Sequence, residues 1–457
     1  MTSVDEFQKK YPTIPREVIV KWEIMRNGVK DTEVLDKVSL WDNAGGSYVT
    51  YDFDLTEEQL QERRKQIKPG LVAILQGFKL KSGMGVGVRR HTKSPYEIKE
   101  VGDGQFALFE GEEKIEDIYY DVFPALSDLQ TSKGTPVTSL VRRRSRRCFH
   151  VNPVRHCEYF DTGDQCRFCN FHSAQDGVRS LGVFRPATIN FDESVEALKI
   201  LGAEVKLIEG RVQMGGFNRT EIEAKMYFNM MEKLGSALPY KVHLTVRPQP
   251  MDRKDMQRLK DVGVRAFTSQ MEIWDRRLFA EVCPGKAKHR GYDYTLEAYQ
   301  AAVDVFGAGN VGTNLVAGVG MLAHDGFSTW QEARDSHIEG NNWLIEHGVV
   351  PFFTALRINA GSIYGDDPAN LEKYPPTELL LEIALAHHEA MKKVGRYQKM
   401  DKFMQCPMDC MDVAYGGEIG ILETAGDFGN WLSDVLRPED NWLAGFIASA
   451  KQPAYKQ

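Results

Sequence analysis

The sequence has no apolar run that approaches the roughly 20 residues of a membrane-spanning helix, and residues 1–15 lack the apolar core of a signal peptide. We therefore expect a cytoplasmic protein that does not cross a membrane. Basic residues are not in excess, since 57 Lys and Arg stand against 64 Asp and Glu, for a net charge of −7. This charge gives no reason to expect nucleic acid as a partner.

Cysteine is scarce and its number is odd, because the 457 residues contain only seven. An odd number of thiols in a large chain without a secretion signal indicates metal ligands in a reducing compartment rather than a disulfide framework. The apolar fraction of 42% and the charged fraction of 26% are ordinary for a globular protein. The length allows two or three domains, or one large barrel with additions.

Three of the cysteines, Cys157, Cys166 and Cys169, lie in the segment CEYFDTGDQCRFC, with gaps of eight and two residues. A tetrahedral zinc site or an all-cysteine iron–sulfur cluster requires four ligands, and this loop supplies three. A [4Fe–4S] cubane on three thiolates would leave one iron able to bind a molecule from outside the protein. Half of a structural zinc site, or three unrelated thiols in a loop, is the alternative.

From residue 146 onward, strand-like and helix-like segments alternate, which is typical of a parallel sheet or barrel. The pattern predicts strands at residues 212–216, 241–247, 264–272, 311–319 and 349–359. It predicts helices at residues 192–201, 220–234, 252–262, 294–306, 329–347 and 377–394. With the strand that leads into the cysteine loop, these make about six βα units, fewer than the eight of a complete barrel. We therefore predict an α/β protein in which residues 146–395 form a partial (βα)6 TIM-type barrel.

Two extensions to this barrel are predicted, an antiparallel β-rich one at residues 1–145 and an irregular one at residues 396–457. In the first, short alternating runs begin at residues 71, 86, 96, 105 and 115, and Gly102-Asp103-Gly104 is a hairpin-type turn signal. A polar helix is expected at residues 55–67. No residue of this N-terminal extension carries a recognisable chemistry.

Two further groups of residues each have two interpretations. The five arginines within residues 142–147 form either a solvated basic face or an anchor for a carboxylate or phosphate, because the arginine fork suits such groups. Cys406 and Cys410 are too few for a four-cysteine auxiliary cluster, so ordinary buried cysteines are favoured at these positions.

The cysteine loop and the barrel pattern together resemble the radical S-adenosylmethionine (SAM) superfamily, over about residues 147–359. In that family three cysteines hold a [4Fe–4S] cluster, whose open iron chelates the amino and carboxylate groups of SAM. The resemblance implies that Cys157, Cys166 and Cys169 are the cluster ligands and that Phe168 lies near the adenine. The CX8CX2C spacing is atypical, because the first gap in the family usually has three residues.

Residues 271–300 are similar to the branch of this family that holds biotin synthase, the iron-hydrogenase maturase and methylornithine synthase. The matching positions are Glu272, Leu278-Phe279, Cys283-Pro284 and Arg290. The resemblance implies that Glu272 and Arg290 bind the ammonium and the carboxylate of SAM, as a zwitterion at the mouth of a barrel requires. A structural Glu–Arg pair is the alternative.

Gly215 and Gly216 correspond to the glycines that end the second strand in this family, where backbone and an acid meet the amino group of SAM. The acid that usually follows these glycines is absent, since Phe217 stands there. Backbone contact from Gly215 and Gly216 is therefore still expected, whereas a side-chain contact is not.

The resemblance further implies that a donor such as ferredoxin or flavodoxin supplies an electron that cleaves SAM to methionine and a 5′-deoxyadenosyl radical. That radical would abstract hydrogen from a small, anionic metabolite for bond cleavage or rearrangement, in cofactor or amino-acid-type biosynthesis. Lyase, mutase and transferase outcomes stay open. His243, Arg247 and Arg357 at strand ends are candidate substrate contacts, and satisfied polar residues of the core or rim are an equal expectation there.

Two other functions stay open. One is a radical SAM enzyme for sulfur insertion or methyl transfer, which would need an auxiliary cluster or a second cofactor. The other is a non-catalytic binding protein stabilised by zinc.

Overall fold

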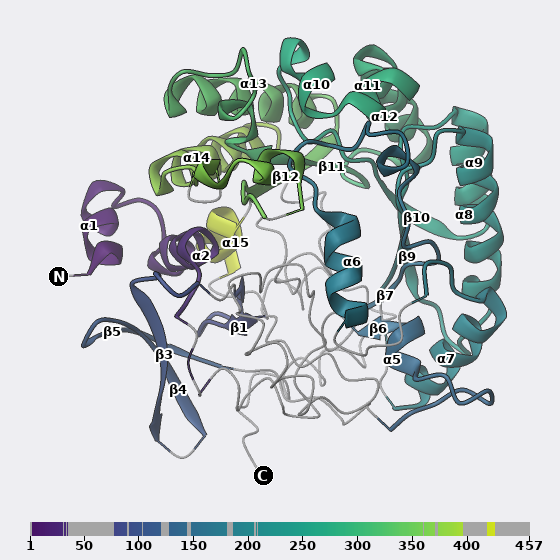
Figure 1. Ribbon diagram of the computed structural model, residues 1–457, viewed down its shortest axis with the longest axis horizontal. Helices are drawn as coiled ribbons and strands as arrows, with labels where there is room; N and C mark the ends of the chain where they lie inside the picture. Colours follow the sequence, from purple (N-terminus) through teal and green to yellow (C-terminus); the bar gives the residue numbers. More distant parts are fainter. Residues whose placement is uncertain are drawn as a thin grey trace.

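The computed structural model describes residues 2–30, 77–88, 91–102, 104–119, 128–143, 148–180, 186–204, 209–359, 361–370, 373–395 and 418–425, together with residues 32, 34 and 207. Its centre is a sheet of seven strands, six of them parallel, and helices cover the outer face of the sheet (Figure 1). The predicted α/β architecture with a partial barrel is thereby confirmed.

The parallel strands follow one another in chain order, so each strand pairs with the next strand along the sequence. They are β7 (Cys148–Val151), β8 (Glu209–Gln213), β9 (His243–Arg247), β10 (Val264–Thr268), β11 (Val311–Ala317) and β12 (Val349–Ala355). The short β6 (Arg142–Arg143) pairs antiparallel with β7, so β6 and β12 are the two edges of the described sheet. The sheet is therefore curved but does not close into a barrel (Figure 1).

A helix follows each of the six parallel strands, and after the first five strands this helix returns the chain to the start of the next strand. These helices are α7 (Phe191–Glu204), α8 (Thr220–Gly235), α9 (Arg253–Asp261), α12 (Tyr292–Phe306), α13 (Trp330–Glu346) and α14 (Thr377–Lys393). Their bounds lie within two or three residues of the predicted ones. The α13 helix shows the local reason, because Thr329 and Glu332 form a reciprocal capping box at its start.

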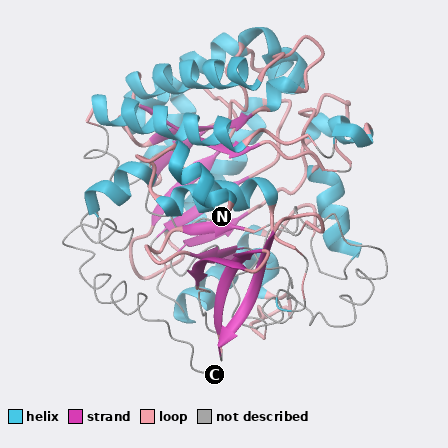
Figure 2. Cartoon of the chain, turned by 90° about the vertical axis from the view of Figure 1, so that its left-hand side faces the viewer, coloured by secondary structure: helices cyan, strands magenta, loops and turns pink. Residues whose placement is uncertain are grey.

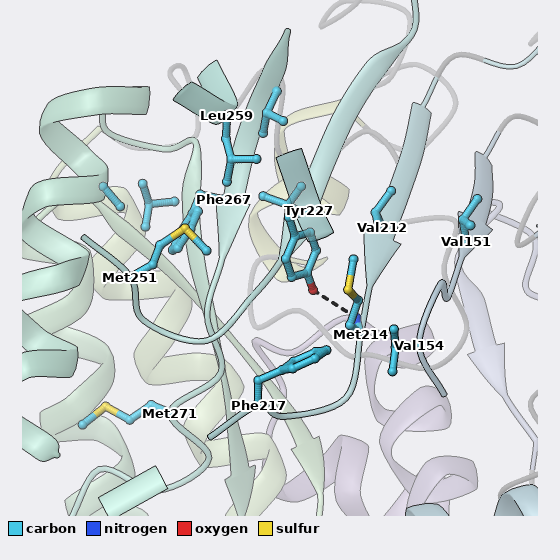
Figure 3. Close-up of a cluster of buried hydrophobic side chains, with 14 of the residues drawn as sticks. Val151, Val154, Val212, Met214, Phe217, Tyr227, Met251, Leu259, Phe267 and Met271 are labelled. Carbon is cyan, nitrogen blue, oxygen red and sulfur yellow. Dashed lines mark hydrogen bonds between the residues drawn. The ribbon is translucent and has the colours of Figure 1, made fainter. Parts of the chain in front are cut away.

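The apolar outer face of the sheet packs against these helices, as Figure 3 shows for the region of β8 and α8. Val212, Met214 and Phe217 lie there beside the ring of Tyr227. The hydroxyl of Tyr227 accepts a hydrogen bond from the backbone N–H of Met214 at 3.0 Å and donates one to the carbonyl of Arg247 at 2.6 Å. One helix side chain thus ties together the carboxyl ends of β8 and β9.

Four predicted strands end earlier than expected, all at the carboxyl edge of the sheet; β11 ends at Ala317 and β12 at Ala355, two and four residues early. The strand predicted at residues 212–216 is β8 at Glu209–Gln213, and Gly215 and Gly216 lie beyond it. The strand predicted at residues 264–272 ends at Thr268, because the backbone of Glu272 has a positive φ that a strand does not accommodate. Three helices follow strand ends where loops were expected: α6 (Phe171–Ser180), α10 (Arg276–Val282) and α11 (Pro284–His289).

The described part of the N-terminal extension contains the predicted antiparallel strands. These are the pair β1 (Gly77–Lys79) and β2 (Gly85–Gly87), and the three-stranded sheet of β3 (Tyr96–Gly102), β4 (Gln105–Glu110) and β5 (Glu113–Ile118), which projects from the molecule (Figures 1 and 2). The predicted helix at residues 55–67 lies outside the described residues.

Two helices of this extension were not predicted, α1 (Ser3–Lys10) and α2 (Arg16–Asn27). The ring of Trp22 in α2 stacks on Phe353 of β12 with centroids 4.5 Å apart, and Thr377 at the start of α14 hydrogen-bonds to the carboxylate of Glu23. The N-terminal extension therefore shares one apolar core with β12 and α14. The division of the chain at residues 145 and 395 stays a prediction.

Among the described residues, no helix combines the length and the apolar character that a membrane crossing requires. Two short helices complete the described chain, α5 (Val137–Leu140) before β6 and α15 (Glu418–Ala425) beside α14.

Candidate functional site

The three predicted ligand cysteines lie together on the loop between β7 and α6, beyond the carboxyl end of the parallel sheet. Burial, with a smaller contribution from the nearby sulfur of Cys166, raises the pKa of Cys157 to about 11. Burial also raises the pKa of Cys169, to which Cys166 and Cys157 both contribute. These mutual effects show that the three sulfur atoms are neighbours in a site that is sheltered from water.

Cys166 differs from the other two, because its pKa is lowered. The largest cause is a hydrogen bond between its side chain and that of Cys283, and the ammonium of Lys286 acts in the same direction against the effect of burial. A thiolate is the form of cysteine that binds metals. The surroundings of Cys166 therefore favour the ligand form already in the protein alone.

Gly215 and Gly216 lie directly beneath the cysteine loop. The backbone N–H of Glu158 donates to the carbonyl of Gly216 at 2.9 Å, and a Cβ atom on Gly215 would come within 1.7 Å of the carbonyl oxygen of His156. A Cβ atom on Gly216 would be 3.1 Å from the sulfur of Cys157. The glycine pair is thus required by the close approach of two backbones, in addition to any contact with SAM.

The α10–α11 segment holds the loop from the other side. The backbone N–H of Arg167 donates to the carbonyl of Val282 at 2.9 Å, and the N–H of Gly285 donates to the carbonyl of Asp164 at 2.8 Å. Lys288 forms an exposed ion pair with the Asp164 carboxylate at 2.8 Å. Residues on both sides of Cys166 are therefore joined to the turn that contains Cys283.

Glu272 is the one non-glycine residue with positive φ, 72°, in the described part of the chain. Two hydrogen bonds to β11 hold this conformation, from the N–H of Glu272 to the carbonyl of Asn314 at 2.9 Å and from the N–H of Val316 to the carbonyl of Glu272 at 2.7 Å. Such a conformation costs on the order of 1–3 kcal/mol and is often found at functional sites. It directs the backbone away from the strand path just before the α10–α11 segment.

The carboxylate of Glu272 forms an ion pair with Lys286, with Nζ and Oε1 2.7 Å apart and both side chains largely buried. Although burial alone would lower the pKa of Lys286, the carboxylate of Glu272 and the sulfur of Cys166 raise it well above its usual value. Lys286 therefore stays an ammonium. A carboxylate and an ammonium stand side by side next to the cysteine sulfurs.

The structure does not contain the Glu272–Arg290 ion pair that was the alternative to binding of SAM by these two residues. The guanidinium of Arg290 lies 3.5 Å from the carboxylate of Glu223 in α8, and its Nη2 donates to the carbonyl of Phe217 at 3.2 Å. Both side chains of this pair are almost completely buried. Lys286, three residues after Cys283, is the cation that pairs with Glu272.

The pair of Glu223 and Arg290 belongs to a buried network beneath the glycine turn. Gln249 donates its backbone N–H to Glu223 at 2.8 Å and its side-chain amide to the carbonyl of Phe217 at 3.0 Å. The hydroxyl of Tyr159, on the cysteine loop, hydrogen-bonds to the side-chain oxygen of Gln249. The network thereby connects α8, the glycine turn and the cysteine loop.

We predict that Glu223 makes the stability of the protein depend on pH. Burial raises the pKa of Glu223 to about 7, although Gln249 and Arg290 act in the opposite direction. The folded protein then retains a proton that the unfolded chain releases near its ordinary value, so the contribution of this carboxyl to stability falls as pH rises from about 4.5 to 7. In urea unfolding over this pH range, Glu223→Gln should remove a decline on the order of 3 kcal/mol.

The matched control for this prediction is Glu221→Gln, which changes an exposed carboxyl on the same helix. The control should leave the pH dependence of the unfolding free energy as in the wild type. Equal slopes for the wild type and Glu223→Gln would contradict the raised pKa.

The inner face of the sheet, opposite the apolar cluster of Figure 3, carries polar side chains. His150, Arg211 and Thr245 stand next to one another in register on β7, β8 and β9, and all three are buried. The predicted substrate contacts His243 and Arg247 lie on the same face of β9, because side chains alternate along a strand. The strand ends thus form a polar surface of the kind expected for substrate contacts.

The remaining predicted residues lie at different distances from this face. Arg265 donates to Nδ1 of His243 at 3.0 Å, and the guanidinium of Arg247 lies 5.5 Å from the ring centre of Phe352. Arg357 donates to the carbonyl of Ile24 at 3.4 Å, which places it against the N-terminal helix α2. Phe168 packs partly buried against the core beneath the cysteine loop. Substrate roles for these residues, and the adenine contact of Phe168, stay predictions.

Several residues for which the sequence analysis made a prediction lie outside the described part of the chain. Cys406 and Cys410 lie outside the described residues, as do three of the arginines within residues 142–147. Of the other two, Arg142 is buried at the start of β6.

The residues present fit a cluster better than a single ion. No group of three or more His, Cys, Asp or Glu side chains in the described residues could hold one metal ion. A cubane makes a different demand, because each of its irons takes its own thiolate, so three ligand sulfurs need not meet at one point. Three neighbouring, partly buried thiols beside the ammonium of Lys286 satisfy that demand.

Lys286 and Glu223 were not found from the sequence, although a signal exists for Lys286. Cys283 and Lys286 are three residues apart, a spacing that puts two side chains on the same side of a helix. The sequence pattern did not predict α11, which is only six residues long, and the relation between Cys283 and Lys286 was therefore missed. Glu223 gave no signal, since an acid in the first turn of a helix is common.

The sequence and fold of the chain are similar to known proteins at low identity and over part of the chain. No family model matches the chain. The bacteriochlorophyllide c C-7(1)-hydroxylase of Chlorobaculum limnaeum is 26% identical over 200 residues, which are 40% of this chain. The matched region spans about half of that relative's own length, 49%.

Similar solved structures include methylornithine synthase, PylB, with 13% identity and a TM-score of 0.39 over 54% of this chain and 64% of that chain. The hydrogenase maturase HydG has 16% identity and a TM-score of 0.38 over 56% and 52% of the two chains. The radical SAM methyltransferase TsrM from Kitasatospora setae, solved with cobalamin and a [4Fe–4S] cluster, has 16% identity and a TM-score of 0.31 over 44% and 34%.

Proposed function

We propose that this chain is a radical SAM enzyme in which Cys157, Cys166 and Cys169 hold a [4Fe–4S] cluster. The observation that carries the proposal is the convergence of these three thiols, with their mutual effects on pKa, at the carboxyl end of a partial parallel barrel. Catalytic residues in such barrels come from strand ends and the loops that follow them. When bound, the cluster supplies the electron that cleaves SAM to a hydrogen-abstracting 5′-deoxyadenosyl radical.

The part of the protein in this chemistry is to bind and orient the zwitterion of SAM next to the cysteines. Glu272 offers a carboxylate for an ammonium group, and Lys286 offers an ammonium for a carboxylate. Their ion pair is largely shielded from water and holds both side chains in place. The ammonium and carboxylate of SAM would replace this pair, each binding the group of opposite charge. Arg290 was predicted to bind the carboxylate of SAM, and that role stays a prediction beside its pairing with Glu223.

The polar inner face of β8 and β9 supports a substrate with an anionic group. Arg211 and Arg247 extend from this face within two neighbouring strands, and guanidinium groups bind carboxylates in a fixed orientation. The similar bacteriochlorophyllide hydroxylase modifies carbon, and hydroxylation of carbon begins with breaking a C–H bond. We therefore propose abstraction of hydrogen from a C–H group of an organic acid, with ferredoxin or flavodoxin as the reductant in the cytoplasm.

Anaerobic reconstitution with iron and sulfide tests this function. We expect about four irons per chain and a brown absorbance near roughly 400 nm, as a thiolate-bound cubane requires. Addition of a strong reductant and SAM should then release 5′-deoxyadenosine and methionine. About eight irons would favour the version with an auxiliary cluster, and bound zinc without iron would overturn the proposal in favour of a zinc-stabilised binding protein.

A further inference from the structure

Cys283 occupies a special position beside the proposed cluster ligands. It is fully buried at the junction where α10 ends and α11 begins, and its side chain is hydrogen-bonded to that of Cys166. In the sequence, Cys283 stood out only as part of the Cys283-Pro284 match within residues 271–300. The structure brings a fourth thiol into direct contact with one of the three ligand sulfurs.

Backbone hydrogen bonds fix this contact on both sides. Arg167, directly after Cys166, donates its N–H to the carbonyl of Val282, directly before Cys283. Gly285 donates its N–H to the carbonyl of Asp164, two residues before Cys166. A Cβ atom on Gly285 would lie 2.6 Å from the ring of Tyr159, so the two segments are in tight contact. The relative position of the two sulfurs is therefore set by the fold rather than by side-chain rotation alone.

The contact has a direction. A cysteine that binds a cluster does so as a thiolate, so Cys166 would be the acceptor, whereas Cys283 is fully buried in the apolar core and is not among the three ligands of the loop. A neutral S–H group beside a thiolate is a hydrogen-bond donor to it. A thiol that donates its hydrogen to the sulfur of Cys166 interacts with that ligand and does not itself bind an iron.

We propose that Cys283 is a positioning residue that donates an S–H···S hydrogen bond to the cluster ligand Cys166 and thereby raises the reduction potential of the cluster. The inference rests on the proposed function. Hydrogen bonds to the sulfurs of a cluster are one of the factors that set its potential, because they withdraw negative charge from the ligand and favour the reduced state. Lys286, whose ion pair is with Glu272, adds a positive charge on the same side of the site.

Redox titration of the reconstituted protein, followed by the electron paramagnetic resonance signal of the reduced cluster, tests this role. In Cys283→Ala the donor is lost, so the midpoint potential should become more negative than in the wild type. In Cys283→Ser the hydroxyl can still donate, so the midpoint should lie closer to the wild type than that of Cys283→Ala. Iron content should stay at about four per chain in all three proteins.

A second measurement keeps the proposal open to refutation if a variant does not fold. Electron–nuclear double resonance of the reduced wild-type cluster should show an exchangeable proton coupling that disappears in D₂O and is absent in folded Cys283→Ala. An unchanged midpoint in folded Cys283→Ala, or no exchangeable coupling in the wild type, would overturn the inference. A fall in iron content on replacing Cys283 would also overturn it, since Cys283 would then be a ligand.

These outcomes are distinct from a failure of the proposed function. If the wild-type protein binds no cluster, both proposals fall together. If the wild type binds about four irons and cleaves SAM while Cys283→Ala keeps the same midpoint, only the role of Cys283 is refuted.

Discussion

Cys166→Ala abolishes the reductive cleavage of SAM in our first main prediction, with release of 5′-deoxyadenosine falling to the background of the assay. The iron content after reconstitution should fall from about four per chain to near zero. The reason is that Cys166 is the thiol whose surroundings favour the metal-binding thiolate, through Cys283 and Lys286. Its loss leaves two of the three proposed ligands, Cys157 and Cys169, whose pKa values burial raises.

The matched control is Cys283→Ser, which also removes a cysteine sulfur from the same site but should retain iron and cleavage. Thermal unfolding of the apoprotein should be similar for Cys166→Ala and the wild type, which separates loss of a ligand from loss of the fold. A Cys166→Ala protein that still cleaves SAM would remove the assignment of this cysteine as a ligand.

Gly215→Ala is the second prediction with a large expected effect. A Cβ atom there would lie 1.7 Å from the carbonyl oxygen of His156 and 2.9 Å from the Cα of Cys157, both of them backbone atoms. Backbone atoms cannot relieve a clash by changing rotamer, as a side chain can. The cysteine loop must therefore shift as a whole. We expect a loss of stability of about 4 kcal/mol or more, in the range of the most damaging substitutions, and a lower iron content after reconstitution.

Gly235→Ala provides the comparison for this experiment. At the end of α8 a Cβ atom would meet its nearest neighbour, the carbonyl oxygen of Val262, at 3.4 Å, and the backbone has no positive φ. The change in stability should therefore stay within about 1 kcal/mol. Urea unfolding and iron analysis of both variants measure the effect. Equal stability and equal iron content for the two would contradict the close contact between the glycine turn and the cysteine loop.

Much of the barrel could be predicted, because each element carries its own pattern in a short stretch of sequence. The Thr329 and Glu332 capping box marks the start of α13 locally. The end of β10 could not be predicted, because the conformation of Glu272 depends on hydrogen bonds to Asn314 and Val316 in the next strand. The α10 and α11 helices were missed for the related reason that short helices depend on what they pack against.

The candidate site divides in the same way. The cysteine spacing identified Cys157, Cys166 and Cys169, because ligands on a single loop lie close together in the sequence. The protein partners of the charged side chains were not predicted, since Glu272 pairs with Lys286 and Arg290 pairs with Glu223. Charge and spacing along the chain do not show which of two nearby cations faces a given carboxylate.

The sequence by itself determined the strand–helix alternation, the trio of thiols and the two glycines, because these depend on the residue types at neighbouring positions. Only the tertiary structure decided that Cys283 contacts Cys166, and that Gly215 is needed by the backbone of His156. These contacts join residues more than fifty positions apart. Their partners are chosen by how the loops at the carboxyl edge of the sheet pack together, and that choice requires the whole fold.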